Sequence, residues 1–409
     1  MMFSSHSLRA GLQVAISTAV LAIALRTWLV MGLIEPVVVA GSSMAPTLRG
    51  DHVTVRCPLC QHEFEVGAEF AEQRDELLCS VCRTRVSMVG LTKKGGDRLW
   101  IDRTAFSMRR PYRWELVVTR CPVDGQLCVK RIVGLPGETV TIKQGDVWVD
   151  GRRVVKRLEQ QRRLRQAVFC RSELRDWWQP APESSWKKDQ GRWRSTGADS
   201  GWLTYMLPEG LPLTDDIAYN ASLSRRLSLV SDWMLSCKVS VQGKGELMLR
   251  VDGGAQTWDV TIRPSNGQLQ LSSDDKVVQV SRILPSTTNR LLTGEVLLEL
   301  STFDRRLLLA LDGKVVWTYS LQEEETQLGI KQPVALAGRR MDLTLRELTL
   351  YRDVYFSKQP VGVKQVETLV SLEANEYYLL GDNPPVSLDS RVWGPVSGTL
   401  FMGRPWATP

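Results

Sequence analysis

The chain has 409 residues, of which 43% are hydrophobic and 24% are charged, and its formal net charge is +7 at pH 7. This length predicts two or more domains, and the composition is that of a packed globular protein. The positive charge is modest and the arginines are scattered, apart from a local cluster at residues 156–165, so we expect no nucleic-acid partner. A weakly basic surface suits anionic lipid headgroups at least as well.

An apolar segment opens the chain. Residues 10–25 are almost wholly apolar, and a second apolar run, Trp28 to Ile34, follows Arg26. Because Arg26 can extend its side chain towards an interface, the two runs together predict one transmembrane helix ending near Ile34. The alternative is a cleavable signal peptide with the small residues Val39-Ala40-Gly41 at its end. Either interpretation sends the downstream chain across a membrane, and Arg9 favours a cytoplasmic N-terminus.

An extended apolar run then leads to a serine that could act as a nucleophile. The run Val38-Val39-Ala40-Gly41-Ser42-Ser43-Met44-Ala45-Pro46 ends in small residues and a proline. A serine at such a strand end attacks a substrate only if a neighbouring base removes its proton. The chain has only three histidines, His6, His52 and His62. Of these, only His52 lies where a catalytic triad could use it, so a lysine base is considered first.

Two C-x2-C pairs follow, with 18 residues between them. This spacing predicts a zinc-ribbon-like insertion over residues 56–84, in which four thiolates hold one structural zinc ion. Two disulfides are the alternative in an oxidising compartment. A glycine–aspartate turn lies on each side, at residues 50–51 and 96–97, so the module looks inserted into one strand–turn unit. The four cysteines are Cys57, Cys60, Cys79 and Cys82.

A predicted hairpin after residue 113 carries a lysine in apolar surroundings. Its first strand is Trp114–Val118, its turn contains Asp124-Gly125, and its returning strand begins at Val129. Lys130 lies on the returning strand, next to valine and isoleucine residues. A lysine in a strand is usually solvated, but these neighbours make Lys130 a candidate base. The sequence leaves open whether Cys121 pairs with Cys128 across the turn, and whether Cys170 pairs with Cys237.

The composition changes near residue 158. Tryptophans stand among polar residues up to about residue 230, and short alternating strands with regular turns follow. This pattern predicts an inserted, jelly-roll-like β-sandwich over residues 158–362. Its tryptophans would permit sugar binding, although most aromatic residues of a sandwich belong to the core. The predicted strands include 233–241, 246–251, 257–262, 268–271, 306–311, 314–319, 334–336 and 341–351.

The C-terminal segment again has apolar strands and a glycine–aspartate turn, like residues 35–155. Gly381-Asp382-Asn383 follows a predicted strand, and Ser387 to Arg391 lie between apolar stretches. Asp389 and Arg391 are two apart, so on an extended strand they would share a face and orient each other. A turn with a surface ion pair is the alternative.

Taken together, these separated blocks resemble the bacterial type I signal peptidases, which are membrane-anchored serine peptidases with a Ser-Lys dyad. The resemblance covers roughly residues 10–155 and 366–409, so the cysteine module and the sandwich are departures from the family pattern and are interpreted as insertions. The blocks that carry it are Ser43-Met44-Ala45-Pro46-Thr47-Leu48, Gly50-Asp51, Lys130 to Glu138, Gly381-Asp382-Asn383 and Asp389-Ser390-Arg391-Val392-Trp393-Gly394.

The resemblance implies a role for each matching residue. Ser43, rather than Ser42, corresponds to the nucleophile and Lys130 to the general base. The family's oxyanion hole uses the nucleophile's backbone N–H and, in some members, a hydroxyl two residues earlier. That position is Gly41 here, so the side-chain donor is absent. No cofactor is implied for catalysis. The supporting positions correspond to Ser387, Asp389 and Arg391.

The predicted fold class is therefore mainly β: a signal-peptidase-like catalytic domain with one N-terminal transmembrane helix and two insertions. The expected function is removal of signal peptides after small residues, at the outer side of the cytoplasmic membrane. Expected partners are exported preproteins, membrane lipid and a glycan or protein ligand of the sandwich. The expected segments are a tail and anchor over 1–34, catalytic parts over 35–157 and 363–409, and insertions over 56–84 and 158–362.

The sequence is also compatible in part with two other functions. A cell-surface glycan- or protein-binding protein could be built on a vestigial peptidase, but every dyad position is occupied. A self-cleaving repressor of a related Ser-Lys fold would need a DNA-binding N-terminus, which the apolar first 34 residues exclude.

Overall fold

The computed structural model describes residues 5–27, 33–79, 82, 84–168, 176–207, 210–322, 329–357, 360–362 and 369–406. They form two compact units, and most of their regular structure is β-strand. The hairpin strands after Val140 group with the second unit, whereas the sequence analysis placed residues up to 157 with the catalytic part. The first unit comprises Met1–Asp51, Gly95–Val140 and Gly362–Pro409, and the second comprises His52–Lys94 and Thr141–Val361.

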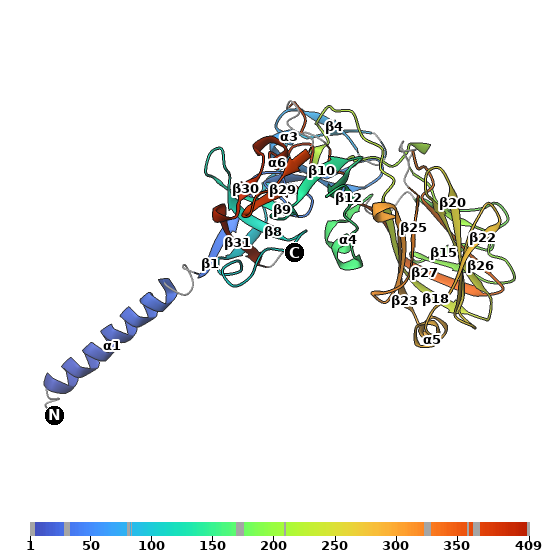
Figure 1. The fold of residues 1–409 in the computed structure, drawn as a ribbon, viewed down its shortest axis with the longest axis horizontal. Coiled ribbons are helices and arrows are strands. Elements are labelled where there is room, and N and C mark those ends of the chain that lie inside the picture. Colours follow the sequence, from blue (N-terminus) through green and yellow to red (C-terminus); the bar gives the residue numbers. More distant parts are fainter. Residues whose placement is uncertain are drawn as a thin grey trace. The chain divides into compact units, whose positions relative to one another are not determined.

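One antiparallel seven-stranded sheet builds the first unit, with the strand order β1-β7-β31-β8-β9-β29-β30 (Figure 1). Segments from both ends of the chain interleave in it, so residues far apart in sequence become neighbours. The strands are β1 (Ile34–Val38), β7 (Arg98–Asp102), β31 (Phe401–Trp406), β8 (Leu116–Arg120), β9 (Leu127–Gly134), β29 (Glu376–Leu380) and β30 (Val396–Ser397). The unit also contains β28 (Leu369–Ser371), α6 (Ser390–Trp393) and the 3-10 turn η5 (Gly398–Leu400).

Strand β9 lies inside this sheet, between β8 and β29. Val117 of β8 is opposite Lys130, and Leu380 of β29 is opposite Arg131. Both charged side chains of β9 are consequently buried, unlike those of an edge strand. The adjoining core cluster consists of Val117, Ile132, Tyr377, Leu379 and Val396.

The N-terminal segment forms helix α1 (Ser5–Leu25). Among the helices that the structure describes, none combines the length and the apolarity needed to cross a membrane. The transmembrane helix expected to end near Ile34 is therefore not found, although residues 28–32 of that prediction lie outside the described part of the chain.

The second unit contains a sandwich of two antiparallel sheets, as the alternating sequence predicted. In β19, for example, Leu247, Leu249 and Val251 are buried, and the residues between them are more exposed. One sheet has the order β15 (Lys187–Asp189), β16 (Arg192–Ser195), β27 (Asp342–Arg352), β18 (Trp233–Gln242), β23 (Val296–Ser301), β24 (Arg306–Leu311) and β25 (Lys314–Ser320), with β13 (Gln166–Ala167) beside β27. The other has the order β14 (Trp178–Pro180), β17 (Leu203–Tyr205), β26 (Val334–Arg339), β19 (Glu246–Asp252), β20 (Thr257–Arg263), β21 (Gln268–Ser273) and β22 (Lys276–Arg282).

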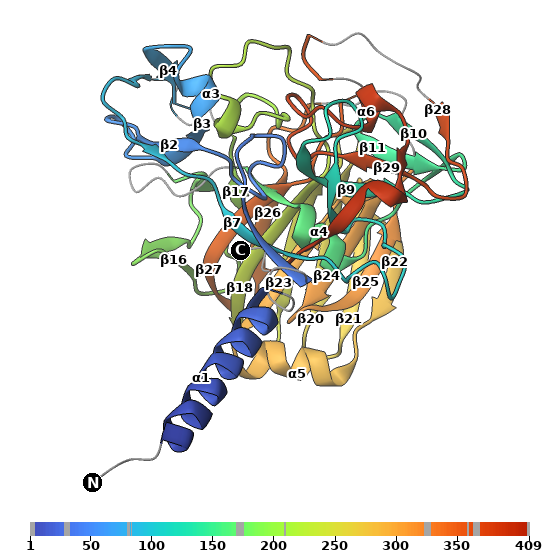
Figure 2. The same ribbon diagram turned by 90° about the vertical axis from the view of Figure 1, so that its left-hand side faces the viewer.

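Helix α5 (Pro285–Thr293) lies at one end of the sandwich, beside β18, in both views (Figures 1 and 2). Helix α5 and the flanking strands β22 and β23 were not among the elements predicted from the sequence. The residues of β22 are largely exposed, so its sequence lacks the alternation of buried and exposed positions by which other strands were predicted.

Short elements complete the second unit. The cysteine module consists of β2 (His52–Arg56), β3 (Glu63–Gly67), α3 (Ala68–Ala71), β4 (Glu76–Leu78), β5 (Arg85–Ser87) and β6 (Lys93–Lys94). The segment before the sandwich contains β10 (Thr139–Lys143), which continues from the first unit, then β11 (Asp146–Val149), β12 (Arg152–Arg153) and α4 (Leu158–Leu164). Two 3-10 turns, η3 (Ala218–Asn220) and η4 (Phe303–Arg305), lie in its loops.

Candidate active site

Ser43 lies in the turn that follows β1. Its side chain is partly exposed, whereas Ser42 is only 3% exposed. Asn383 holds this turn from the other end of the chain: its backbone N–H donates to Ser43 O at 3.0 Å, and its side-chain amide donates to Ser42 O at 2.9 Å. The buried Met44 and Leu48 pack beneath the turn. The Ser43 hydroxyl therefore sits on a fixed backbone and remains reachable.

Lys130 is buried in the same unit, with 2% of its surface exposed. Its Nζ donates to Ser387 Oγ at 3.3 Å and lies 5.7 Å from the centre of the Trp393 ring. Burial lowers the pKa of Lys130, and the opposing attraction of the Asp389 carboxylate is the smaller effect. A lysine with a lowered pKa can act as a base near neutral pH.

Gly381 brings Ser43 and Ser387 together. A Cβ atom added at Gly381 would lie 2.2 Å from Ser387 Oγ and 2.5 Å from Ser43 O. Both oxygens therefore border the same glycine, and no side chain fits at this position. Because Ser387 also accepts the hydrogen bond from Lys130, the predicted nucleophile and base are gathered around one short segment, residues 381–387.

Asp389 and Arg391 form a buried ion pair, but not on an extended strand as the sequence analysis expected. Asp389 is the N-cap of α6, and its side chain accepts from the Arg391 N–H at 3.2 Å. The Arg391 guanidinium donates to both carboxylate oxygens, at 2.8 and 2.7 Å. It also donates to Ser387 O at 3.2 Å, so the pair fixes the loop that carries Ser387. The helical turn, rather than the period of a strand, sets this geometry.

A second buried ion pair, between Arg131 and Asp382, was missed. The Arg131 Nε donates to Asp382 Oδ1 at 2.7 Å, and another guanidinium nitrogen donates to Trp114 O at 2.7 Å. The pair ties β9 to the strand end after β29, beside Lys130. Both residues stand in the blocks that carry the family resemblance, which was the available signal.

Gly41 is exposed, and a Cβ atom there would meet nothing within 4 Å. The position has room for a side chain but supplies no hydroxyl. The Ser43 backbone N–H is the donor that the family resemblance implies for an oxyanion.

The four cysteines of the second unit come together. Their Sγ atoms all lie within 4.8 Å of one another, with Cys57 to Cys82 at 3.5 Å and Cys60 to Cys79 at 3.6 Å. Four thiolates around a zinc ion at Zn–S distances of about 2.3 Å would be ~3.8 Å apart. The two C-x2-C turns have the same kind of backbone hydrogen bond: the Cys57 N–H donates to His62 O, and the Cys79 N–H donates to Thr84 O. The donor set therefore fits a tetrahedral metal ion.

The other cysteines show no pairing among the described residues. Cys121, Cys128 and Cys237 are free thiols, and Cys170 lies outside the described part of the chain. Cys121 donates its N–H to Gln126 O, so Cys128 is its diagonal neighbour across the hairpin rather than its direct partner.

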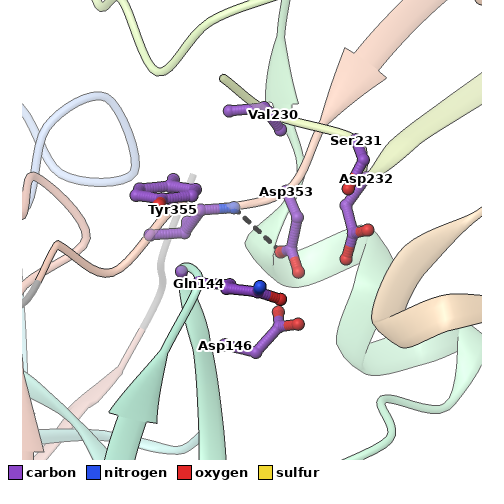
Figure 3. Close-up of a pocket in the computed structure, with 9 residues that line it drawn as sticks. Gln144, Asp146, Val230, Ser231, Asp232, Asp353 and Tyr355 are labelled. Atoms are coloured by element: carbon purple, nitrogen blue, oxygen red, sulfur yellow. Dashed lines mark hydrogen bonds between the residues drawn. The ribbon is translucent and has the colours of Figure 1, made fainter. Parts of the chain in front are cut away.

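A charged cluster that the sequence analysis did not predict lies in the second unit; we name it the Lys156 cluster. Lys156 Nζ pairs with Asp304 and, at 2.8 Å, with Asp353, and four carboxylates approach within 4.8 Å of one another. Figure 3 shows Asp146, Asp232 and Asp353 converging beside a small pocket. Burial raises the pKa of Asp232 to about 7 and that of Asp353 to about 6. Its members are Lys156, Asp146, Asp232, Asp304 and Asp353.

Comparison with solved structures finds carbohydrate-binding folds, at low similarity. Carbohydrate-binding module CBM66 from Bacillus subtilis is 11% identical, covers 42% of this chain and 94% of its own, and has a TM-score of 0.28. Galectin LEC-6 from Caenorhabditis elegans is 8% identical, covers 28% of this chain and 83% of its own, and has a TM-score of 0.22. Scores this low support no inference about a ligand.

Two curated proteins are similar over short segments. "Probable signal peptidase I-2" of Synechocystis is 40% identical over 63 residues, which is 14% of this chain and 28% of that protein. "Signal peptidase I V" of Bacillus subtilis is 29% identical over 65 residues, which is 16% of this chain and 38% of that protein. The chain thus matches about a third of the length of these relatives.

A profile of the family "Signal peptidase, peptidase S26" matches residues 77–199 and 309–406, together more than half of the chain. These ranges contain Lys130 and the segment from Ser387 to Arg391, and they begin after Ser43. On this match, the chain belongs to the signal peptidase family, peptidase S26, and resembles its type I members.

Proposed function

We propose that the protein is a serine endopeptidase that removes N-terminal signal peptides from exported preproteins, with Ser43 as the nucleophile and Lys130 as the general base. The observation that carries this proposal is the buried Lys130 amine, which donates to Ser387 Oγ beside the segment that holds the Ser43 backbone. Among the described residues Lys130 forms no ion pair, although the Asp389 charge attracts it. Burying such a lysine is costly, and catalysis explains its presence.

The reaction follows from this arrangement. Neutral Lys130 accepts the Ser43 hydroxyl proton while Oγ attacks the scissile carbonyl, and the Ser43 N–H stabilises the oxyanion. Lys130 then donates its proton to the departing amine, leaving an acyl-enzyme. In the second half, Lys130 takes a proton from water, which attacks the ester; Lys130 then returns this proton to Ser43 Oγ as the ester bond breaks and the signal peptide leaves. Ser387, held by the Asp389–Arg391 pair, orients the amine throughout.

The substrate would bind in an extended conformation. Strand β1 pairs with β7 on one side and is the edge strand of its sheet, so its other side can accept a further strand. The edge leads directly to Ser43. We propose that small side chains before the cut are selected there, at the outer surface of the cytoplasmic membrane, where the apolar residues 10–34 associate with lipid.

Replacing Ser43 with alanine tests the function. Detergent-solubilised protein should convert a model precursor to its mature form, and Ser43→Ala should stop this because no other residue supplies the attacking oxygen. The measurement is product formation on gels with the cut site read by mass spectrometry. Ser42→Ala is the matched control: the Ser42 hydroxyl is buried and has no hydrogen-bond partner among the described residues, so its loss should leave processing intact. Equal processing by the wild type and Ser43→Ala would refute the assignment.

For the cysteine module we propose a structural zinc ion held by Cys57, Cys60, Cys79 and Cys82. Elemental analysis of purified protein should find one equivalent of zinc, and Cys60→Ser should lose it. Four thiolates leave no open coordination position, so the metal would have a structural role only. Removing it should destabilise the module but should not remove a catalytic group. Absence of zinc together with absence of free thiols would instead indicate two disulfides.

A further inference from the structure

Trp393 lies over the amine that the proposed mechanism uses as its base. Its ring centre is 5.7 Å from Lys130 Nζ. Trp393 is partly exposed and Lys130 is only 2% exposed, so the ring is the more solvent-exposed of the two groups. Trp393 belongs to one of the sequence blocks of the family resemblance, but the sequence analysis assigned it no role.

The local fold fixes this ring. Trp393 is the last residue of α6, and its N–H donates to Asp389 O at 2.9 Å. Gly394 follows with φ of 80°, which ends the helix in a conformation that suits glycine. The indole also packs against the core that contains Tyr377 and Val396. One segment thus supplies the hydrogen bond of Ser387, the Asp389–Arg391 pair and the cover of Trp393.

The charged groups near Lys130 largely offset one another, so the access of water to the amine decides its protonation state. Asp389 draws the amine towards the charged form, but its carboxylate is engaged by Arg391 and by the Gly381 N–H at 3.0 Å. Arg391 acts in the opposite direction. Cys128 and Cys121, from the hairpin that carries Lys130, also face it, and burial raises the pKa of the Cys128 thiol to about 11, so this thiol is neutral at working pH.

We propose that Trp393 is a positioning residue for the proposed peptidase reaction: its indole excludes water from Lys130 Nζ and thereby keeps the amine in the neutral, proton-accepting form. The ring also attracts a cation, which acts in the opposite sense. That attraction is worth less than about one pKa unit at a partly exposed ring. Loss of hydration can shift a lysine by up to about 3 to 5 units. Exclusion of water should therefore dominate.

The pH dependence of kcat/KM for a model precursor tests this proposal, which rests on the proposed function. Trp393→Ala should move the acidic midpoint up by about one pH unit, a tenfold loss of kcat/KM below the midpoint, while the high-pH plateau changes less than about threefold. Trp393→Leu keeps an apolar cover and should move the midpoint by less than half as much. Trp406→Ala, at the exposed end of β31, is the matched control and should not move it.

Two outcomes would overturn the proposal. An equal loss at every pH for Trp393→Ala would mean that the ring is only structural. A lower midpoint for Trp393→Leu than for the wild type would mean that attraction between ring and cation dominates.

A second readout separates this proposal from the peptidase assignment. In full-length protein carrying Ser43→Ala and 13C at lysine Cε, NMR titration gives the pKa of Lys130 directly, with its signal identified by loss in Lys130→Met. Adding Trp393→Ala should raise that pKa by about one unit. If the wild type cuts no precursor but this shift is found, the proposed function fails and the role of Trp393 stands. If the shift is absent, the role of Trp393 is refuted whatever the activity.

Discussion

Lys130→Met is expected to abolish precursor processing while leaving the first unit folded. General base catalysis contributes about 10²- to 10⁴-fold, and without it the Ser43 hydroxyl keeps its proton. Methionine matches the unbranched shape of lysine and fills the apolar site without a charge. Single-turnover processing of a model precursor should therefore fall at least 100-fold, on the order of the general-base contribution. Lys187→Met, on an exposed strand of the sandwich, is the control and should process normally.

The same variant should be at least as stable as the wild type. Because burial lowers the pKa of Lys130, the folded state binds fewer protons than the unfolded state between that lowered pKa and about 10.4. The free energy of unfolding of the wild type should therefore increase as pH rises through this window. In Lys130→Met this increase should be absent. Urea unfolding at several pH values measures both slopes. Processing by a folded Lys130→Met protein would refute the assignment of the base.

Local sequence patterns predicted the elements of the fold better than their junctions. The alternation in β18, β19 and β20 gave strand bounds within about a residue, because one face of each strand is buried. The C-x2-C spacing likewise predicted four sulfurs that the structure brings together. Both patterns depend on residues that lie close together in the sequence. The Asp389 cap was misjudged because four residues of helix carry too little periodicity to distinguish them from a strand.

Contacts between distant segments could not be predicted from composition or period. Asn383 reaches the Ser43 turn, and Asp382 reaches Arg131, only because β29 lies beside β9 in the sheet. The family resemblance supplied the order of these blocks but not the hydrogen bonds that join them. The Lys156 cluster had no signal at all, since isolated aspartates near strand ends read as ordinary turn residues.

The largest stability effect is expected at the Lys156 cluster, for Lys156→Met. Although burial alone would lower the pKa of Lys156, the carboxylates of Asp304 and Asp353 raise it. Its ammonium therefore balances a buried acidic group together with Arg153, whose Nε lies 2.9 Å from the Asp146 carboxylate. Removing one member of a buried ion pair costs about 3 to 5 kcal/mol. Hydrogen exchange of β18 and β27, recorded with chelator present so that no metal ion substitutes, should report this loss of unfolding free energy.

Asp232→Asn removes a negative charge from the same cluster and should stabilise the second unit. Burial and the neighbouring Asp304 and Asp353 raise the pKa of Asp232 to about 7, whereas the unfolded value is near 3.9. Between these values the folded state binds the extra proton, so the free energy of unfolding falls as pH rises from about 4 to 7. Asparagine imitates the protonated acid, so Asp232→Asn should stabilise the second unit by on the order of 1 to 3 kcal/mol at pH 8 and hardly at pH 4.5. Destabilisation at pH 8 would show instead that the Asp232 charge is needed, and that the four carboxylates are balanced by a cation beyond Lys156 and Arg153.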